Sequence, residues 1–103
     1  CALPILTAIV TAYCACAICC GPRAAGMTAS GVRPQQGVTV AASRSVPFGV
    51  RLRVAGLSNT FIVQDRLSKR LDSRVDIYFA SHQDAKKFGI TRRQITLSWP
   101  PPP

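Results

Sequence analysis

Acidic side chains are scarce in this chain of 103 residues, which contains four aspartates, no glutamate and thirteen lysines and arginines. The formal net charge of +9 favours polyanionic partners, namely nucleic acid, anionic lipid headgroups or an acidic cell wall. Three of the four aspartates, Asp65, Asp72 and Asp76, nevertheless lie within residues 63–79. This concentration makes residues 63–79 the first candidate region for catalytic or binding residues.

Features of nucleic-acid binders and of histidine-based catalysts are missing as well. The basic residues are spread along the chain without a run of five like charges, and the few aromatic residues are not interleaved with arginine. We therefore interpret the charge as a solvated surface and expect no nucleic-acid partner. His82 is the only histidine, so a Ser-His-Asp or Cys-His catalyst would have to use it. Next to Ser81, at the start of a predicted helix, a capping or surface role is expected instead.

The length corresponds to one domain with a single core. Residues 1–20 carry no charge and are long enough to test as a membrane span, but Pro4 and the β-branched residues that follow favour an extended strand. No transmembrane span is therefore expected. Residues 1–10 are interpreted as an N-terminal strand or the remnant of a processed leader, with a lipid-anchored Cys1 as an alternative. The folded domain is expected at 11–98 and a proline-rich tail at 99–103.

Short apolar or alternating segments dominate the rest of the chain. They predict strands at about 5–13, 37–43, 50–56, 59–65, 74–79 and 94–99. One helix is predicted at 81–89, with Ser81 as N-cap, Asp84 three residues later and Gly89 as the stop. Six short strands and one small helix indicate a mainly β protein, a small six-stranded β-barrel.

Four motifs follow one another along the chain: "TASGVRPQQG", "TVAASRSVPFGVRLRVAGL", "VQDR" and "RVDIYFASHQDAKKFG". Together, in this order, they resemble the 3D (three-aspartate) domain family, and the resemblance covers residues 11–97. The family includes the catalytic domain of membrane-bound lytic transglycosylase A and the stationary-phase survival enzymes of the cell wall. The resemblance implies a double-psi β-barrel fold.

The resemblance also implies an activity and a site. Family members cleave the β-1,4 bond between N-acetylmuramic acid and N-acetylglucosamine and release a 1,6-anhydro product. Asp76 matches the catalytic acid/base and Asp65 the supporting aspartate, while Thr28 and Ser30 of "TASG" are expected to contact the glycan. The alternative for "TASG" is a turn whose hydroxyls bond to the backbone. No cofactor is implied. The partners implied are peptidoglycan strands and anionic wall polymers, acted on by a secreted or envelope-associated monomer.

Strand alternation places Arg74 and Tyr78 on the same face as Asp76, so both are expected to contact substrate. A single acid suffices for this chemistry if its pKa is raised towards neutrality by its apolar neighbours and by the charge of Asp65. Arg66 and Arg74 would oppose that shift. The alternative for the two aspartates is a pair of surface ion pairs with these arginines.

The chain departs from the family pattern in two places. Leu67 and Ser68 stand where the family has two glycines, and Asp72 replaces a third. Ser43 or Arg44 stands where the family has its remaining aspartate. These differences favour a second hypothesis, a non-catalytic, expansin-like module that binds cell-wall glycan.

Four cysteines lie within seven residues: Cys14, Cys16, Cys19 and Cys20. Zinc sites usually draw thiolates from two separate chain segments, and no second segment is evident in the sequence. Disulfides suit an exported wall protein better, so we expect disulfides of open connectivity and no metal.

Overall fold

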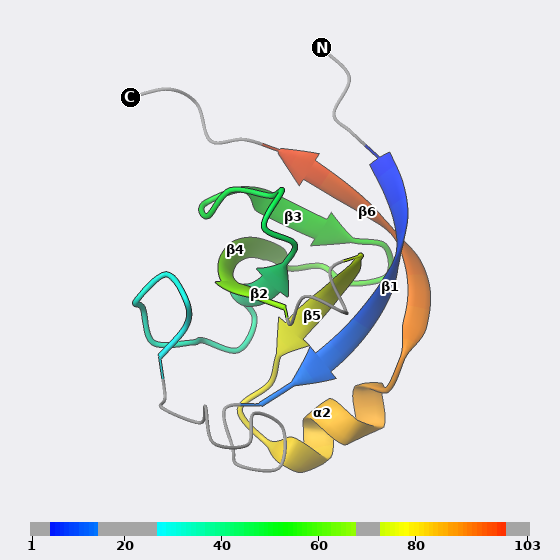
Figure 1. Cartoon of the computed structure of the whole chain (residues 1–103). Coiled ribbons are helices and arrows are strands. Elements are labelled where there is room, and N and C mark those ends of the chain that lie inside the picture. The colour runs from blue at the N-terminus through cyan, green and yellow to red at the C-terminus, as the bar shows by residue number, and fades with distance from the viewer. Residues whose placement is uncertain (1–4, 15–26, 68–72, 99–103) are drawn as a thin grey trace.

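The computed structural model describes residues 5–14, 27–67 and 73–98, which form six strands and one helix. The strands are β1 (Ile5–Tyr13), β2 (Thr39–Ala42), β3 (Arg51–Val54), β4 (Thr60–Arg66), β5 (Arg74–Tyr78) and β6 (Thr91–Ser98). They close into a barrel in the order β1-β5-β2-β4-β3-β6 (Figure 1). The prediction of a mainly β, six-stranded barrel with one short helix is confirmed.

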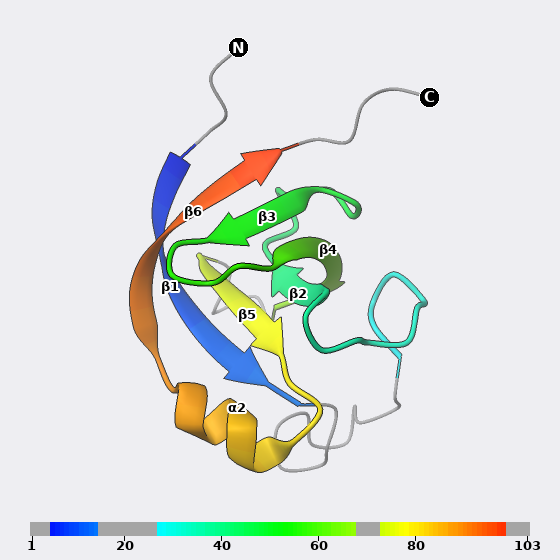
Figure 2. The same ribbon diagram turned by 180° about the vertical axis from the view of Figure 1, so that it is seen from behind.

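The strand pairing is mixed. β1 runs parallel to β5 and β2 runs parallel to β4, whereas the other four neighbouring pairs are antiparallel. Parallel neighbours require long crossovers, so strands far apart in sequence become direct neighbours. β1 and β5, which are more than sixty residues apart along the chain, lie side by side in this way (Figures 1 and 2).

The barrel interior is the hydrophobic core. On β3 the exposed Arg51 and Arg53 alternate with the buried Leu52 and Val54, as the sequence pattern predicted. β5 alternates in the same way, so its apolar side chains point inward. Burial of each such side chain contributes about 1.5–3 kcal/mol. The interior cluster comprises Val10, Val40, Ala42, Val50, Leu52, Val54, Phe61, Val63, Val75, Ile77, Ile95 and Leu97.

The helix α2 (His82–Phe88) lies across one end of the barrel, opposite the end where β1 begins and β6 finishes (Figure 2). The Ser81 hydroxyl accepts a hydrogen bond from the Asp84 amide at 3.4 Å, and Gly89 ends the helix with a positive φ of 71°. Within the described residues, no helix has the length and apolar character needed to cross a membrane.

The last strand is longer than predicted. β6 begins at Thr91, because this residue pairs with Val10 of β1 and the antiparallel ladder continues from there. The sequence did not predict residues 91–93 as part of this strand, because the adjacent charges of Arg92 and Arg93 interrupt the apolar pattern. Residues 1–4 of the segment expected at 1–10, the tail at 99–103, Ser68 and Asp72 lie outside the described residues.

Candidate active site

Asp65 and Asp76 lie in one row that crosses four strands of the barrel. Asp76 of β5 is paired with Thr11 of β1 on one side and with Ala41 of β2 on the other. Ala41 is paired in turn with Asp65 of β4. Side chains of paired residues share a face of the sheet, so both carboxylates lie on the outer face of the barrel, with one alanine between them. We call these four residues the acid row.

A β-bulge puts Asp65 into the acid row. Val40 is paired with Val63, but the next residue, Ala41, is paired with Asp65 because the register shifts by one position on β4. An unbroken ladder would have placed Gln64 beside Ala41 and turned Asp65 to the other face. The side chain of Gln64 instead accepts a hydrogen bond from the buried Thr39 hydroxyl at 2.7 Å, which anchors the bulge.

Asp76 is a half-buried carboxyl with one strong donor. Its neighbours Val75 and Ile77 point into the core, and the Thr11 hydroxyl donates to its Oδ1 at 2.9 Å. Burial raises the pKa of Asp76 from 3.8 to about 6, and the charge of Asp65 adds to this, while the Thr11 hydrogen bond and Arg74 oppose it. A carboxyl with a pKa in this range can exchange its proton near neutral pH.

Asp65 has the opposite surroundings, because three donors converge on its carboxylate. The Tyr13 hydroxyl donates to Oδ2, and the backbone amides of Ala29 and Arg66 both donate to Oδ1, each at 2.9 Å. All three partners are donors, so the Asp65 carboxyl acts here as a hydrogen-bond acceptor. Asp65 thus links the loop around Ala29 to the barrel at the β4 end of the acid row.

The loop fastened by Asp65 carries the two hydroxyl residues expected to contact glycan. The Thr28 hydroxyl donates to the Val32 carbonyl at 2.9 Å and lies 3.0 Å from the Ser30 hydroxyl. The Ser30 amide donates to the Gln64 carbonyl at 3.1 Å, a second link between this loop and β4. Thr28 is buried and shapes the turn, whereas Ser30 is partly exposed beside Asp65.

Thr11 and Tyr13 were missed by the sequence analysis as site residues. Both lie on one face of β1, the strand that pairs with β5. The rings of Tyr13 and Tyr78, which are paired across these two strands, meet edge to face with centroids 5.6 Å apart. The sequence did show two hydroxyl-bearing residues separated by one position on a predicted strand. That pattern could not be assigned to the site without knowing that β1 pairs with β5 in parallel.

The arginines beside the two aspartates are placed differently. The Arg66 guanidinium lies over the Phe48 ring at 3.9 Å, so it stacks on an aromatic side chain. Its Nη1 is buried and has no hydrogen-bond partner among the residues that the structure describes. Arg74 remains on the face of Asp76, as predicted, and lowers the pKa of that carboxyl through its charge.

Of the positions that depart from the 3D pattern, Leu67, Ser43 and Arg44 lie within the described residues. Leu67 is buried. Where Ser43 or Arg44 stands in place of the family's remaining aspartate, the hydroxyls of Ser43 and Ser45 lie 2.9 Å apart, and the Ser45 amide donates to the Ser43 hydroxyl. A hydroxyl pair therefore occupies a position where the resemblance would expect a carboxylate.

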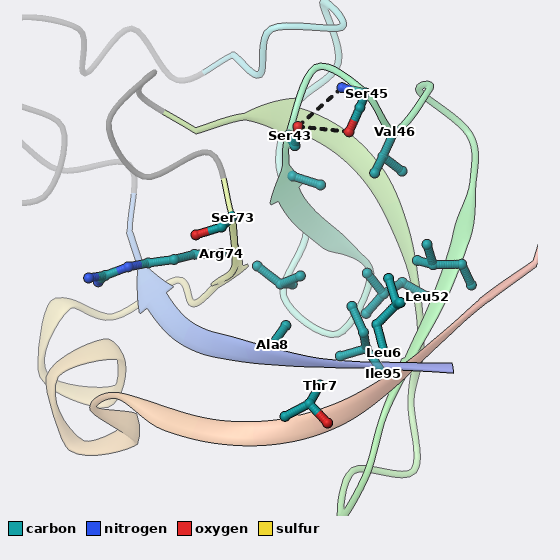
Figure 3. A pocket seen from close by; sticks show the side chains of 13 residues that line it. Leu6, Thr7, Ala8, Ser43, Ser45, Val46, Leu52, Ser73, Arg74 and Ile95 are labelled. Carbon is teal, nitrogen blue, oxygen red and sulfur yellow. Dashed lines mark hydrogen bonds between the residues drawn. The ribbon is translucent and has the colours of Figure 1, made fainter. Parts of the chain in front are cut away.

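A pocket of about 290 Å³ opens at the end of the barrel where β1 and β5 begin. Its wall is mostly apolar, and the side chains of Ser43, Ser45 and Ser73 lie at its edge (Figure 3). The Arg74 side chain also lies at the edge and points away from the pocket. Neither Asp65 nor Asp76 lines this pocket. The acid row and the pocket are therefore separate features that adjoin on β5, at Arg74 and Val75, and on β2, where Ala42 follows Ala41.

Of the cysteine cluster, only Cys14 falls within the described residues, where it is buried. No group of three or more His, Cys, Asp or Glu side chains that could hold a metal gathers among the residues described.

Comparison with family models finds none that matches this chain, and comparison with curated proteins finds no match either.

Proposed function

We propose that this protein is a peptidoglycan lytic transglycosylase related to the 3D domain family. The observation that carries the proposal is Asp76, a half-buried carboxyl whose pKa is raised to about 6 and which lies in register with a second aspartate. A carboxyl that exchanges its proton near neutral pH is what a general acid and base requires. Perturbed carboxyls of this kind concentrate at functional sites.

The reaction needs one group that first gives and then takes a proton. Protonated Asp76 donates its proton to the glycosidic oxygen as the bond from that oxygen to C1 of the muramic acid breaks. The resulting carboxylate then removes the proton from the C6 hydroxyl, whose oxygen closes on C1 to form the 1,6-anhydro ring. Asp76 is protonated again at the end, and no water is consumed. Hydrolytic glycosidases, in contrast, normally use two carboxyls in separate roles.

The remaining residues of the site bind or position. The charge of Asp65 raises the pKa of Asp76 and would favour the positive charge that develops at C1. Ser30, Tyr78 and Arg74 lie around the acid row and are the proposed glycan contacts, with Thr28 shaping the loop that presents Ser30. The net charge of +9 suits a secreted or envelope-associated protein that meets anionic wall polymer.

The Ser43–Ser45 pair favours a second candidate function, a wall-binding module without catalysis. A hydroxyl pair can hydrogen-bond to sugar, but it supplies neither a proton near neutral pH nor a negative charge. In this alternative the outer face of the barrel would hold glycan strands and leave them intact.

The test is digestion of purified sacculi, with the released muropeptides analysed by mass spectrometry. The wild-type chain should release 1,6-anhydro products, Asp76→Asn should release none, and Asp84→Asn should match the wild type, because Asp84 lies on α2 away from the acid row. Hydrolysed, reducing-end products would contradict the mechanism. Binding to sacculi without any release by the wild type would establish the binding module.

A further inference from the structure

One end of the barrel combines an open apolar pocket with exposed apolar side chains. It is the end where β1 begins and β6 finishes (Figure 1). Ile5 and Leu6, the first two residues of β1, are 64% and 51% exposed. Leu6 also lines the pocket of about 290 Å³ (Figure 3). Exposed apolar groups that continue into an apolar pocket mark a surface that binds another molecule.

Exposed arginines border this apolar surface. Arg53 of β3 and Ile5 of β1 are both paired with Thr96 of β6, so these three side chains share one row on the outer face. Arg51 is paired with the last residue of β6, and Arg44 lies in the loop between two of the serines at the pocket edge. All three arginines are exposed. We call the surface formed by Ile5, Leu6, Arg44, Arg51 and Arg53 the pocket end.

The pocket end carries positive charge without a carboxylate among its residues. Within the described residues the aspartates are Asp65 and Asp76 in the acid row and Asp84 on α2, and none of them lines the pocket. Arg51 and Arg53 stand two positions apart on one strand, about 7 Å. This separation is shorter than the Debye length of about 8 Å at physiological salt, so their attractions for an anionic surface add.

A bilayer that contains anionic lipid matches both properties of the pocket end. Its headgroups attract arginine, and its acyl region accepts apolar side chains. Anionic wall polymer would pair with the arginines but offers little apolar surface to Ile5 and Leu6. Nucleic acid offers its bases, but proteins bind unpaired bases by stacking them on aromatic side chains. No aromatic residue belongs to the pocket end or lines the pocket.

We propose that the pocket end docks on the surface of a bilayer that contains anionic lipid. The arginines contact headgroup phosphates, Ile5 and Leu6 enter the interface, and the pocket extends the apolar contact. Docking in this orientation keeps α2, which lies across the opposite end of the barrel, away from the bilayer (Figure 2). The proposal does not depend on the proposed function, because neither aspartate of the acid row belongs to the pocket end.

The test is flotation of the whole chain with vesicles of phosphatidylcholine, alone or mixed with phosphatidylglycerol, at physiological salt. The wild-type chain should float with the mixed, anionic vesicles and not with the neutral ones. Replacement of both Arg51→Gln and Arg53→Gln should weaken binding by about fivefold for each arginine removed. Ile5→Ser should weaken it by about tenfold, because an apolar side chain no longer enters the interface. All three side chains are exposed, so these variants keep the core intact.

The opposite end of the barrel supplies matched controls. Lys86→Gln with Lys87→Gln removes the same amount of charge from α2, and Ile90→Ser removes a side chain that is 71% exposed directly after this helix. Both variants should bind the anionic vesicles nearly as the wild type does. Equal weakening by the variants at the two ends would overturn the proposal, because net charge alone would then drive binding. A wild-type chain that floats with neither kind of vesicle, while it binds wall polymer or nucleic acid, would overturn it as well.

Discussion

The two sides of the acid row differ in what surrounds otherwise identical side chains. On the β5 side, Asp76 has one hydroxyl donor and is desolvated between inward-pointing valine and isoleucine neighbours. On the β4 side, Asp65 receives three donors, two of them backbone amides. Burial raises the pKa of Asp76. One row thus holds a carboxyl that can exchange its proton and a carboxyl that anchors a loop by accepting hydrogen bonds, and the surroundings of each decide its role.

The largest expected effect is that of Asp76→Asn, which should change activity and stability in opposite directions. Asp76→Asn should abolish anhydro-product release, since positioned acid and base catalysis contributes about 10²–10⁴-fold. The same variant should be more stable than the wild type at pH 8, by up to about 3 kcal/mol, because it removes the cost of burying a charge. The Asn side-chain oxygen can still accept from Thr11. Urea unfolding at pH 8 measures this difference, and a loss of stability comparable to that of a core substitution would contradict the assignment.

The same pKa gives a pH dependence with a definite sign. The pKa of Asp76 is raised from 3.8 to about 6 on folding, so the folded state holds this proton more tightly than the unfolded state. Its contribution to stability is fully present below pH 3.8 and is lost as the pH rises through 6. The wild-type chain should therefore lose about 2.5 kcal/mol relative to Asp76→Asn between pH 3.8 and pH 7.

Unfolding of both chains over this pH range tests the prediction, since the other titrating groups are common to the two and cancel in the difference. A difference that does not change with pH would mean that Asp76 titrates normally. Product release should fall in parallel above pH 6, because the chemistry begins from the protonated acid.

The next largest effect is expected on the β4 side of the acid row, for Asp65→Asn. Asn keeps one acceptor oxygen in place of two and adds an amide that would face donors, so stability should fall by about 1.5–3 kcal/mol. Amide hydrogen exchange should accelerate around Ala29 and Ser30, whose links to the barrel run through Asp65 and Gln64. Loss of the neighbouring charge should also lower the pKa of Asp76. Asp84→Asn is the matched control, and unchanged exchange around Ala29 in Asp65→Asn would remove Asp65 from its positioning role.

How far the sequence could lead is clear from particular elements. Alternation on β3 and β5 and the Ser81 cap have local physical causes, so the strands, the helix and the outward face of Asp76 were predictable. The neighbours of Asp76 were not, because Thr11 reaches it through a parallel pairing between segments more than sixty residues apart. The bulge that turns Asp65 into the acid row was likewise hidden, since its effect depends on the register with Ala41.

The smallest expected effect is that of removing the Thr11 hydroxyl, which donates a hydrogen bond to Asp76. Thr11→Val removes the hydroxyl and keeps the shape, so the pKa of Asp76 should rise, because the Thr11 hydrogen bond lowers it in the wild type. Stability near neutral pH should fall by about 1 kcal/mol. The carboxyl titration followed by ¹³C NMR gives the direction of the shift, with Thr7→Val, an exposed position on the same strand, as control. If Thr11→Val left the titration unchanged, the contrast between the two sides of the acid row would rest on burial and on the charge of Asp65 alone, and Thr11 would only fill space beside the acid.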